Sequence, residues 1–162
     1  TDVVWGNLDY LFIDMPPGTG DVPLTVFQSL PVDGIIVVTS PQELVSMIVK
    51  KAYNMARQMD IPVLGVVENM AIHVCSQCGH AEHIFGTGGG ERIAQQYDTK
   101  LLGALPLDLS IREQADGGCP SVAADPESSI SQTYRAVARQ AAAELWQASR
   151  QVQAPVITIS DD

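Results

Sequence analysis

The hydrophobic pattern of the chain contains four short apolar runs, which cover residues 8–14, 34–39, 62–67 and 101–105. Each run has the length and continuous apolar character of a strand that is buried on both faces. Segments with apolar residues at spacings of three and four follow the later runs, as in amphipathic helices. Strands that alternate with helices predict an α/β fold with a mainly parallel sheet and crossover connections.

Four helices are expected, at residues 41–59, 91–97, 110–116 and 127–149. In the first helix, the stripe expected to face the sheet consists of Leu44, Ile48, Ala52, Met55 and Met59. In the last helix, the equivalent stripe consists of Ile130, Tyr134, Val137, Ala141 and Leu145. Residues 1–149 are therefore expected to form one domain, and residues 150–162, which lack a clear period, a disordered tail.

The composition describes a globular protein, because 46% of the 162 residues are hydrophobic and only 17% are charged. A formal charge of −10 disfavours nonspecific binding to nucleic acid or to an anionic membrane, since both would be repelled. No apolar run reaches the roughly 18 residues of a membrane span, and the N-terminus does not resemble a secretory signal. The prediction is a soluble, cytoplasmic protein with neither nucleic acid nor membrane as a partner.

The first apolar run ends in Asp14, and the string Met15-Pro16-Pro17-Gly18-Thr19-Gly20-Asp21 follows it. A carboxylate at the carboxyl end of a buried parallel strand faces the crevice where α/β proteins bind ligands, and can hold a hydrated magnesium ion. Glycines just beyond it let backbone N–H groups approach a terminal phosphate. A strand that ends in Asp is equally typical of a simple turn, so the whole string carries the argument.

Residues 14–21 resemble the signature of the Mrp/ApbC branch of the MinD/ParA-like P-loop ATPases, and the resemblance extends to about Ser149. It implies a partial P-loop NTPase fold of the SIMIBI type, with three layers and a mainly parallel sheet. It also implies ATP and Mg²⁺ as ligands. Asp14 then lies in the magnesium shell as the catalytic residue, and Gly18 lies near the γ-phosphate.

The same resemblance assigns two adenine contacts, Asn69 after the third apolar run and Pro106 after the fourth. An Asn amide can pair with a purine edge, and the family contacts adenine through backbone groups near this proline. A turn-capping role for Asn69 and a plain loop role for Pro106 remain the alternatives.

The glycine-rich phosphate loop of a P-loop NTPase, with its following Lys and Ser or Thr, is not found in this sequence. Residues 86–92 contain glycines but no such pair, so they are expected to form a flexible loop that leads into a helix. In the family, the phosphate loop precedes the strand that ends at Asp14. The sequence therefore resembles the C-terminal part of the domain, and we expect no detectable ATP hydrolysis from it alone and self-association through uncovered apolar edges.

Cys75 and Cys78 are spaced so that both thiolates can bind one soft metal centre, with Gly79 available for the turn. One pair supplies only half of a four-thiolate site. In the Mrp/ApbC family, the pairs of two subunits are thought to hold one [4Fe–4S] cluster at a dimer interface. The resemblance thus implies a homodimer through this region that carries a cluster to apo iron–sulfur proteins.

Other interpretations of the pair remain open. Cys75, Cys78, His80 and His83 can be arranged as a closed zinc site within one chain, although the spacing is cramped. The pair can also be a redox disulfide or two unliganded reactive thiols. The corresponding alternative functions are a MinD/ParA-like regulatory ATPase and a structural zinc-binding interaction module. Cys119 has no partner at ligand spacing and is interpreted as a loop residue.

Overall fold

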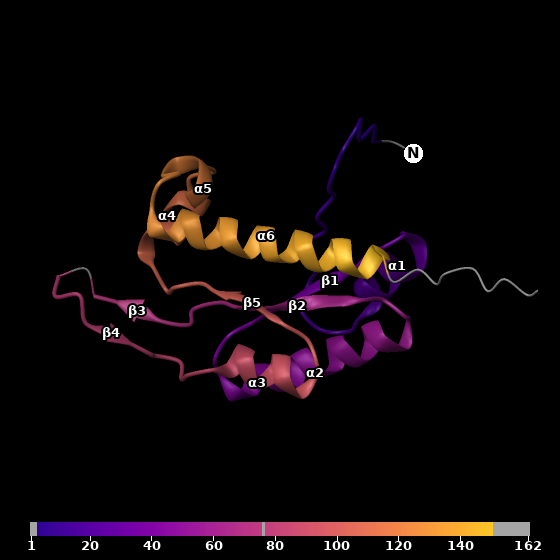
Figure 1. Ribbon diagram of the computed structural model, residues 1–162, viewed down its shortest axis with the longest axis horizontal. Coiled ribbons are helices and arrows are strands. Elements are labelled where there is room, and N and C mark those ends of the chain that lie inside the picture. The colour runs from indigo at the N-terminus through magenta and orange to yellow at the C-terminus, as the bar shows by residue number, and fades with distance from the viewer. Residues whose placement is uncertain (1–2, 76, 151–162) are drawn as a thin grey trace, which may run out of the picture.

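The computed structural model describes residues 3–75 and 77–150 (Figure 1). Its centre is a parallel sheet of three strands, β1 (Ile35–Thr39), β2 (Val63–Glu68) and β5 (Leu101–Ala104). β2 lies in the middle and pairs with β1 on one side and β5 on the other. Three of the four predicted strands are confirmed, and the fold is of the expected α/β class.

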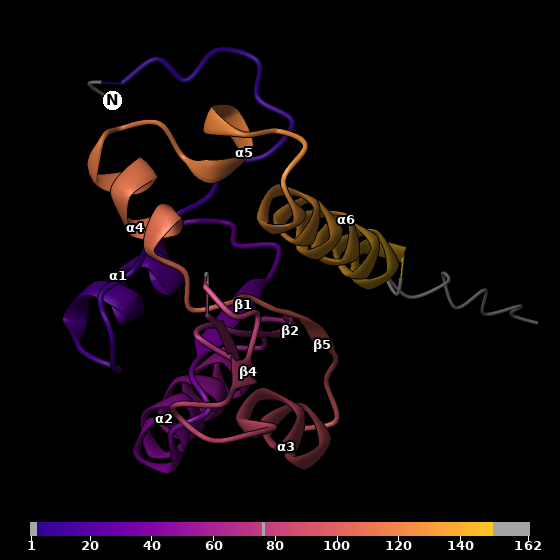
Figure 2. The same ribbon diagram turned by 90° about the vertical axis from the view of Figure 1, so that its left-hand side faces the viewer.

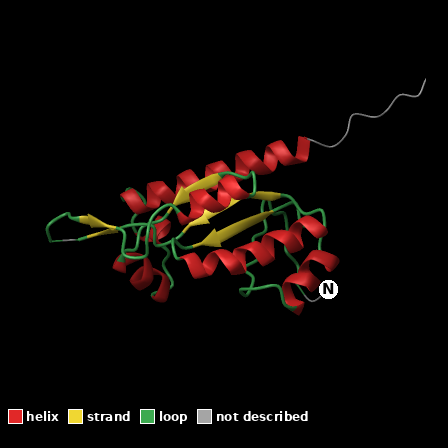
Figure 3. Cartoon of the chain, turned by 90° about the horizontal axis from the view of Figure 1, so that it is seen from below, coloured by secondary structure: helices red, strands yellow, loops and turns green. Residues whose placement is uncertain are grey.

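Helices cover both faces of this sheet (Figure 1 and Figure 3). α2 (Glu43–Gln58) and α3 (Gly89–Gln96) lie on one face, and α6 (Ser129–Arg150) crosses the other. The predicted helices at 41–59, 91–97 and 127–149 are confirmed within two residues at each end. Because β2 is covered on both faces, nearly all of its residues must be buried, which explains its continuous apolar character.

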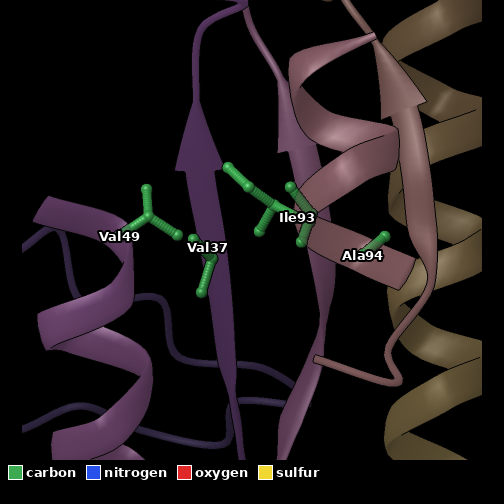
Figure 4. Packing of buried hydrophobic residues seen from close by; sticks show 5 residues of the cluster. Val37, Val49, Ile93 and Ala94 are labelled. Atoms are coloured by element: carbon green, nitrogen blue, oxygen red, sulfur yellow. The ribbon is translucent and has the colours of Figure 1, made fainter. Parts of the chain in front are cut away.

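The core divides into two clusters on opposite faces of the sheet. Val66 of β2 belongs to the cluster under α2 and α3, and the next residue, Val67, belongs to the cluster under α6, as strand alternation requires. The first cluster consists of Val37, Val49, Val66, Ile93 and Ala94 (Figure 4). The second consists of Val67, Leu102, Leu105 and Ala141.

The apolar stripe of the last predicted helix is confirmed, but that of the first is wrong. In α6, Ala141 is buried, and Tyr134 and Val137 pack against its cluster. In α2, Leu44 is 83% exposed, whereas Val49 is only 4% exposed and faces the sheet. A second stripe of Val45, Val49 and Ala56 runs one position further along α2, and its compact side chains let the helix pack closely on the strands.

The remaining elements lie around the sheet. They are α1 (Asp21–Ser29), a hairpin of β3 (His73–Val74) and β4 (Ala81–Glu82), α4 (Leu109–Asp116) and α5 (Ser121–Ala124). The helix predicted at 110–116 is confirmed as α4, whereas α1, α5 and the hairpin were not predicted. The hairpin projects beyond the end of the sheet (Figure 1). None of the helices within the described ranges is long and apolar enough to cross a membrane.

The predicted strand at residues 8–14 is wrong, because this segment has no strand structure. Its side chains are exposed, with Phe12 79% and Leu8 53% accessible. A strand needs a neighbour to satisfy its backbone N–H and C=O groups. Among the described residues, β1 pairs only with β2, and no strand pairs with its other edge. The segment passes away from the sheet instead (Figure 2).

The predicted tail falls largely outside the described residues. Residues 151–162 are not among them, so the structure does not test this prediction, whereas residue 150 is the last residue of α6.

Candidate functional site

The carboxyl ends of the three parallel strands meet at one edge of the sheet. Here Asn69 donates its backbone N–H to the carbonyl of Thr39, at 2.7 Å, and Leu105 donates its N–H to the carbonyl of Glu68, at 2.8 Å. Asn69 and Pro106 therefore follow neighbouring strands at the same edge, where open α/β sheets bind their ligands. The structure brings together the two residues that were predicted to contact adenine.

Asn69 is half-buried, and its side chain already has one local partner. Its Oδ1 accepts a hydrogen bond from the backbone N–H of Met70, at 3.0 Å, and Met70 has a positive φ of 56°. This bond is local, but it goes to the next residue and not to the residue two positions along the chain that defines an Asn-capped turn. It leaves the Asn69 Nδ2 without a partner among the described residues, so the amide can still donate to a base. The adenine role remains a prediction.

Asp14 and Gly18 lie in the segment that precedes α1. Asp14 is exposed and follows a coil, not a buried strand, because residues 8–14 form no ladder. The structure therefore does not place this carboxylate at the carboxyl end of a sheet strand. The predicted roles of Asp14 in magnesium binding and of Gly18 near the γ-phosphate remain predictions.

Glu68 is a residue at this edge that the sequence analysis did not use. Its side chain is only 4% exposed, and Oε2 accepts a hydrogen bond from the backbone N–H of Gly90, at 3.1 Å. This bond joins the end of β2 to the start of α3, whose N-cap, Gly88, has no side chain to cap it. Residues 86–88 thus lead into α3, as expected, but residues 89–92 of the predicted loop already belong to the helix. The signal for Glu68 was a carboxylate directly after the apolar run of residues 62–67.

The two cysteines of the predicted metal pair lie at the tip of the β3–β4 hairpin. The strands are antiparallel, with His73 opposite Glu82. At the tip, Cys75 donates its N–H to the carbonyl of His80 and accepts at its own carbonyl from Gly79, both at 2.9 Å. Gly79 has a φ of 71°, which a residue with a side chain rarely adopts, so it allows the chain to turn directly after Cys78.

The local backbone favours a thiolate at Cys75. The N–H groups of Gln77 and then Cys78 donate to its sulfur and, with the Cys78 thiol, hold the pKa of Cys75 below its ordinary value. Partial burial and the negative charge of Glu82 oppose this shift. Thiolates are the form that binds soft metals, so the tip is prepared for ligation. Cys75 is half-buried, Cys78 is exposed, and both are free thiols.

The closed zinc site predicted as an alternative is not formed. Within residues 3–75 and 77–150, no three His, Cys, Asp or Glu side chains gather as metal ligands. His83 points its Nδ1 at the carbonyl of Ala71, at 2.8 Å, and His73 points its Nδ1 at the carbonyl of Leu107, at 3.2 Å. The hairpin therefore offers a pair of thiols without a complete set of four ligands. Cys119 is exposed in the turn after α4, as expected for a loop residue.

Comparisons with known proteins show which family the chain resembles. The family model described as "ParA: NUBPL iron-transfer P-loop NTPase" matches residues 1–142. An iron–sulfur cluster carrier protein of Pseudomonas fragi is 56% identical over 138 residues, which are 85% of this chain and 48% of that protein. A protein of the same name from Escherichia coli K12 is 51% identical over 147 residues, which are 90% of this chain and 40% of that protein.

A solved structure extends the comparison to the fold. A nucleotide-binding protein of Archaeoglobus fulgidus, in complex with ADP and with cobalt found in it, is 45% identical and has a TM-score of 0.63. The similarity covers 70% of this chain and 47% of that one. The fold is therefore that of the P-loop NTPases. The chain spans less than half of the length of each of these relatives.

Proposed function

We propose, since the chain belongs to the ParA-like family of NUBPL iron-transfer P-loop NTPases, that it carries a labile iron–sulfur cluster on Cys75 and Cys78. The recipients are apo iron–sulfur proteins. The observation that supports this most strongly is the exposed hairpin tip, where backbone N–H groups favour a thiolate at Cys75. An exposed pair of thiolates suits a carrier, because a cluster held there can be reached and removed by a recipient.

The cluster is shared by two copies of the chain. A [4Fe–4S] cluster is typically held by four thiolates, and one hairpin provides two. Two hairpins that meet tip to tip across a two-fold axis provide the full set, so the homodimer forms through the cysteine region. The exposure of Cys78 supports this arrangement, because the tip must be open for a second copy to approach.

Nucleotide is the second ligand of the proposed function. Asn69 and the backbone around Pro106 contact the adenine base, because they share one edge of the sheet and the Asn69 amide can still donate. Asp14 and Gly18 serve the Mg²⁺ and the γ-phosphate. In the protein as a whole, ATP binding and hydrolysis control the dimer that holds the cluster, and the carrier works in the cytoplasm. The ADP-bound relative from Archaeoglobus fulgidus supports the nucleotide assignment.

Anaerobic reconstitution with iron and sulfide tests the cluster assignment. The expected result is broad visible absorbance, with about two irons and two acid-labile sulfides per chain, half of a shared [4Fe–4S] cluster. Cys75→Ser and Cys78→Ser are expected to lose the absorbance, whereas the matched control Cys119→Ser keeps it. Uptake of zinc with no acid-labile sulfide would contradict the proposal, and so would a cluster that survives in both of the first two variants.

A further inference from the structure

His73 and His83 lie on the two sides of the cysteine hairpin, and each directs its Nδ1 at a backbone carbonyl. The His73 ring faces the carbonyl of Leu107, in the segment after β5, and the His83 ring faces the carbonyl of Ala71, at the base of the hairpin. From these contacts we propose that His73 and His83 are positioning residues: His73 ties the cysteine hairpin to the segment that follows β5, His83 closes the base of the hairpin, and together they set the direction in which the thiolates face. The proposal rests on the proposed function, because it concerns how the cluster-binding tip is held. It assigns to these histidines a role other than metal ligation.

A hairpin of this size needs such support. β3 and β4 have two residues each, and an isolated two-stranded hairpin is marginally stable at best in water. Two copies can share a cluster only if both tips keep their orientation, since a misplaced thiolate cannot complete the four-thiolate set. The orientation must therefore be set by contacts between the base of the hairpin and the rest of the fold.

His73 holds the outgoing side of the hairpin. Backbone bonds already join this side to the segment after β5, since Ala71 donates to the carbonyl of Leu105 at 2.9 Å and Leu107 donates to the carbonyl of Ile72 at 2.8 Å. His73 forms an isolated bridge with Leu107 and adds a side-chain bond to the same residue's carbonyl. The segment it binds follows Pro106, so His73 connects the cysteine hairpin to the edge of the sheet where adenine is proposed to bind.

His83 holds the returning side of the hairpin. It directly follows β4, and its Nδ1 lies 2.8 Å from the carbonyl of Ala71 on the outgoing side. Ala71 therefore has its N–H bonded to the carbonyl of Leu105 and its carbonyl bonded to His83. The imidazole closes the base of the hairpin where the short β3–β4 ladder has ended.

The contacts fix the tautomer of both rings. A carbonyl oxygen only accepts hydrogen bonds, so Nδ1 must carry the proton in both histidines, and Nε2 holds the lone pair when the ring is neutral. In many metal sites, the same Nδ1–H to carbonyl bond orients a ring that binds metal through Nε2. A positioning role and a metal-ligand role therefore differ in one observable. Only in a metal ligand does the Nε2 resonance change when metal or a cluster binds to the cysteines.

Nitrogen-15 NMR of the imidazole rings gives a readout that does not depend on activity. In the metal-free chain, His73 and His83 are expected as Nδ1–H tautomers, and their Nε2 resonances are expected to stay within the apo range when zinc or a cluster is added. A proton on Nε2 in place of Nδ1, or an Nε2 resonance that moves to the metal-bound range, would overturn the proposal. Because the tautomers are measured in the metal-free chain, this part of the experiment tests the proposal even if the chain binds no cluster.

Variants test the positioning role on the loaded dimer. His83→Leu removes the Nδ1 donor and is expected to lose its cluster to a chelator about tenfold faster, as for groups that orient metal ligands. His83→Asn is expected to restore the wild-type rate, because its side-chain amide can donate to the Ala71 carbonyl. The same pair of substitutions at His73 is expected to behave alike. His80→Leu is the matched control, because its side chain has no bond among the described residues.

The outcomes separate the two proposals. A wild-type chain that takes up no cluster contradicts the proposed function, whereas the tautomers still test the positioning role. A wild-type chain that binds the cluster while His83→Leu and His73→Leu release it at the wild-type rate contradicts the positioning role alone. Failure of both Asn variants to restore the rate, with far-ultraviolet circular dichroism unchanged, would also contradict it.

Discussion

The strand β2 and the segment of residues 8–14 are both apolar, and both end in a carboxylate, Glu68 and Asp14. β2 lies between β1 and β5, and Glu68 is only 4% exposed. The segment 8–14 has no neighbouring strand among the described residues, and Phe12 in its middle is 79% exposed. Neighbouring strands therefore decide whether such a run becomes a buried strand, because they supply the partners for its backbone N–H and C=O groups.

Amide hydrogen exchange gives the largest expected contrast between these two regions. The Val66 amide, bonded to the carbonyl of Lys100 at 2.8 Å in the centre of the sheet, is expected to exchange only on global unfolding. The Phe12 amide is expected to exchange near its intrinsic rate, roughly three or more orders of magnitude faster. Protection across residues 8–14 would contradict this contrast, since it would show that the segment pairs with another strand, for example in a self-associated species.

Substitutions that add or remove bulk should show the same contrast in stability. A Cβ at Gly65 of β2 would lie 2.6 Å from Leu102 Cγ and 2.7 Å from the carbonyl oxygen of Lys100, and its φ of 157° also disfavours a side chain. Gly65→Ala is therefore expected to lower the free energy of unfolding by about 1–3 kcal/mol. Phe12→Ser is expected to change it by less than about 0.5 kcal/mol. Urea unfolding measures both, and equal costs would contradict the comparison.

The N-termini of α4 and α1 differ in the same way, because only one of them is capped by a side chain. α4 begins after Asp108, whose side chain accepts hydrogen bonds from the N–H of Ser110 at 2.8 Å and from its hydroxyl at 2.6 Å. α1 begins after Gly20, which has no side-chain cap. Asp108→Ala is expected to lower the free energy of unfolding by about 1 kcal/mol at neutral pH. Gly20→Asp is expected to raise it by only about a few tenths of a kcal/mol.

The cost of Asp108→Ala should depend on pH. The Ser110 hydroxyl, then its N–H, and then the nearby charge of His73 lower the pKa of Asp108 below its ordinary 3.8. A lowered folded-state pKa means that the carboxylate stabilises the fold fully above the ordinary value and loses this effect as the pH falls through the lowered one. The difference from wild type should therefore shrink in acid, and Asp108→Asn, which caps without titrating, serves as the control. A difference that is constant down to the acid limit would contradict the assignment.

The smallest effect is expected for an ion pair between the sheet and α6. The Lys100 Nζ lies 2.6 Å from Glu144 Oε1, but the Lys100 side chain is 58% exposed, so solvent and salt screen the attraction. Lys100→Met is expected to lower the free energy of unfolding by less than about 1 kcal/mol, and this difference from wild type should disappear in high salt. A larger, salt-insensitive cost would show that α6 is not held mainly by the apolar cluster around Val67 and Ala141.

The sequence predicted the central sheet and its main helices because their signals are local. β1, β2 and β5 are continuous apolar runs, and α2 and α6, which cover the two faces of the sheet, repeat apolar residues at helical spacing. Residues 8–14 form an apolar run of the same kind. The strand prediction failed there because the sequence of a run does not show whether a neighbouring strand is present to pair with it. The sheet-facing stripe of α2 was wrong for a related reason. Two stripes overlap on this helix, and only packing on the strands selects Val49 over Leu44.

The candidate site was predicted in part. The spacing of Cys75 and Cys78 was sufficient to find the pair. Asn69 and Pro106 were assigned through the family resemblance, and the structure adds that they follow neighbouring strands at one edge of the sheet. The hairpin that presents the cysteines was not predicted, since strands of two residues have no period. The directions of the His73 and His83 side chains depend on carbonyls of residues 71 and 107, so no local pattern could separate an anchoring histidine from a zinc ligand.

Native mass spectrometry of the anaerobically reconstituted chain tests most directly whether two copies share one cluster on Cys75 and Cys78. The expected result is one species with the mass of two chains and a single [4Fe–4S] cluster, which separates into apo chains when the cluster is removed. A single chain that carries zinc, or a single chain that holds a complete cluster, would contradict it.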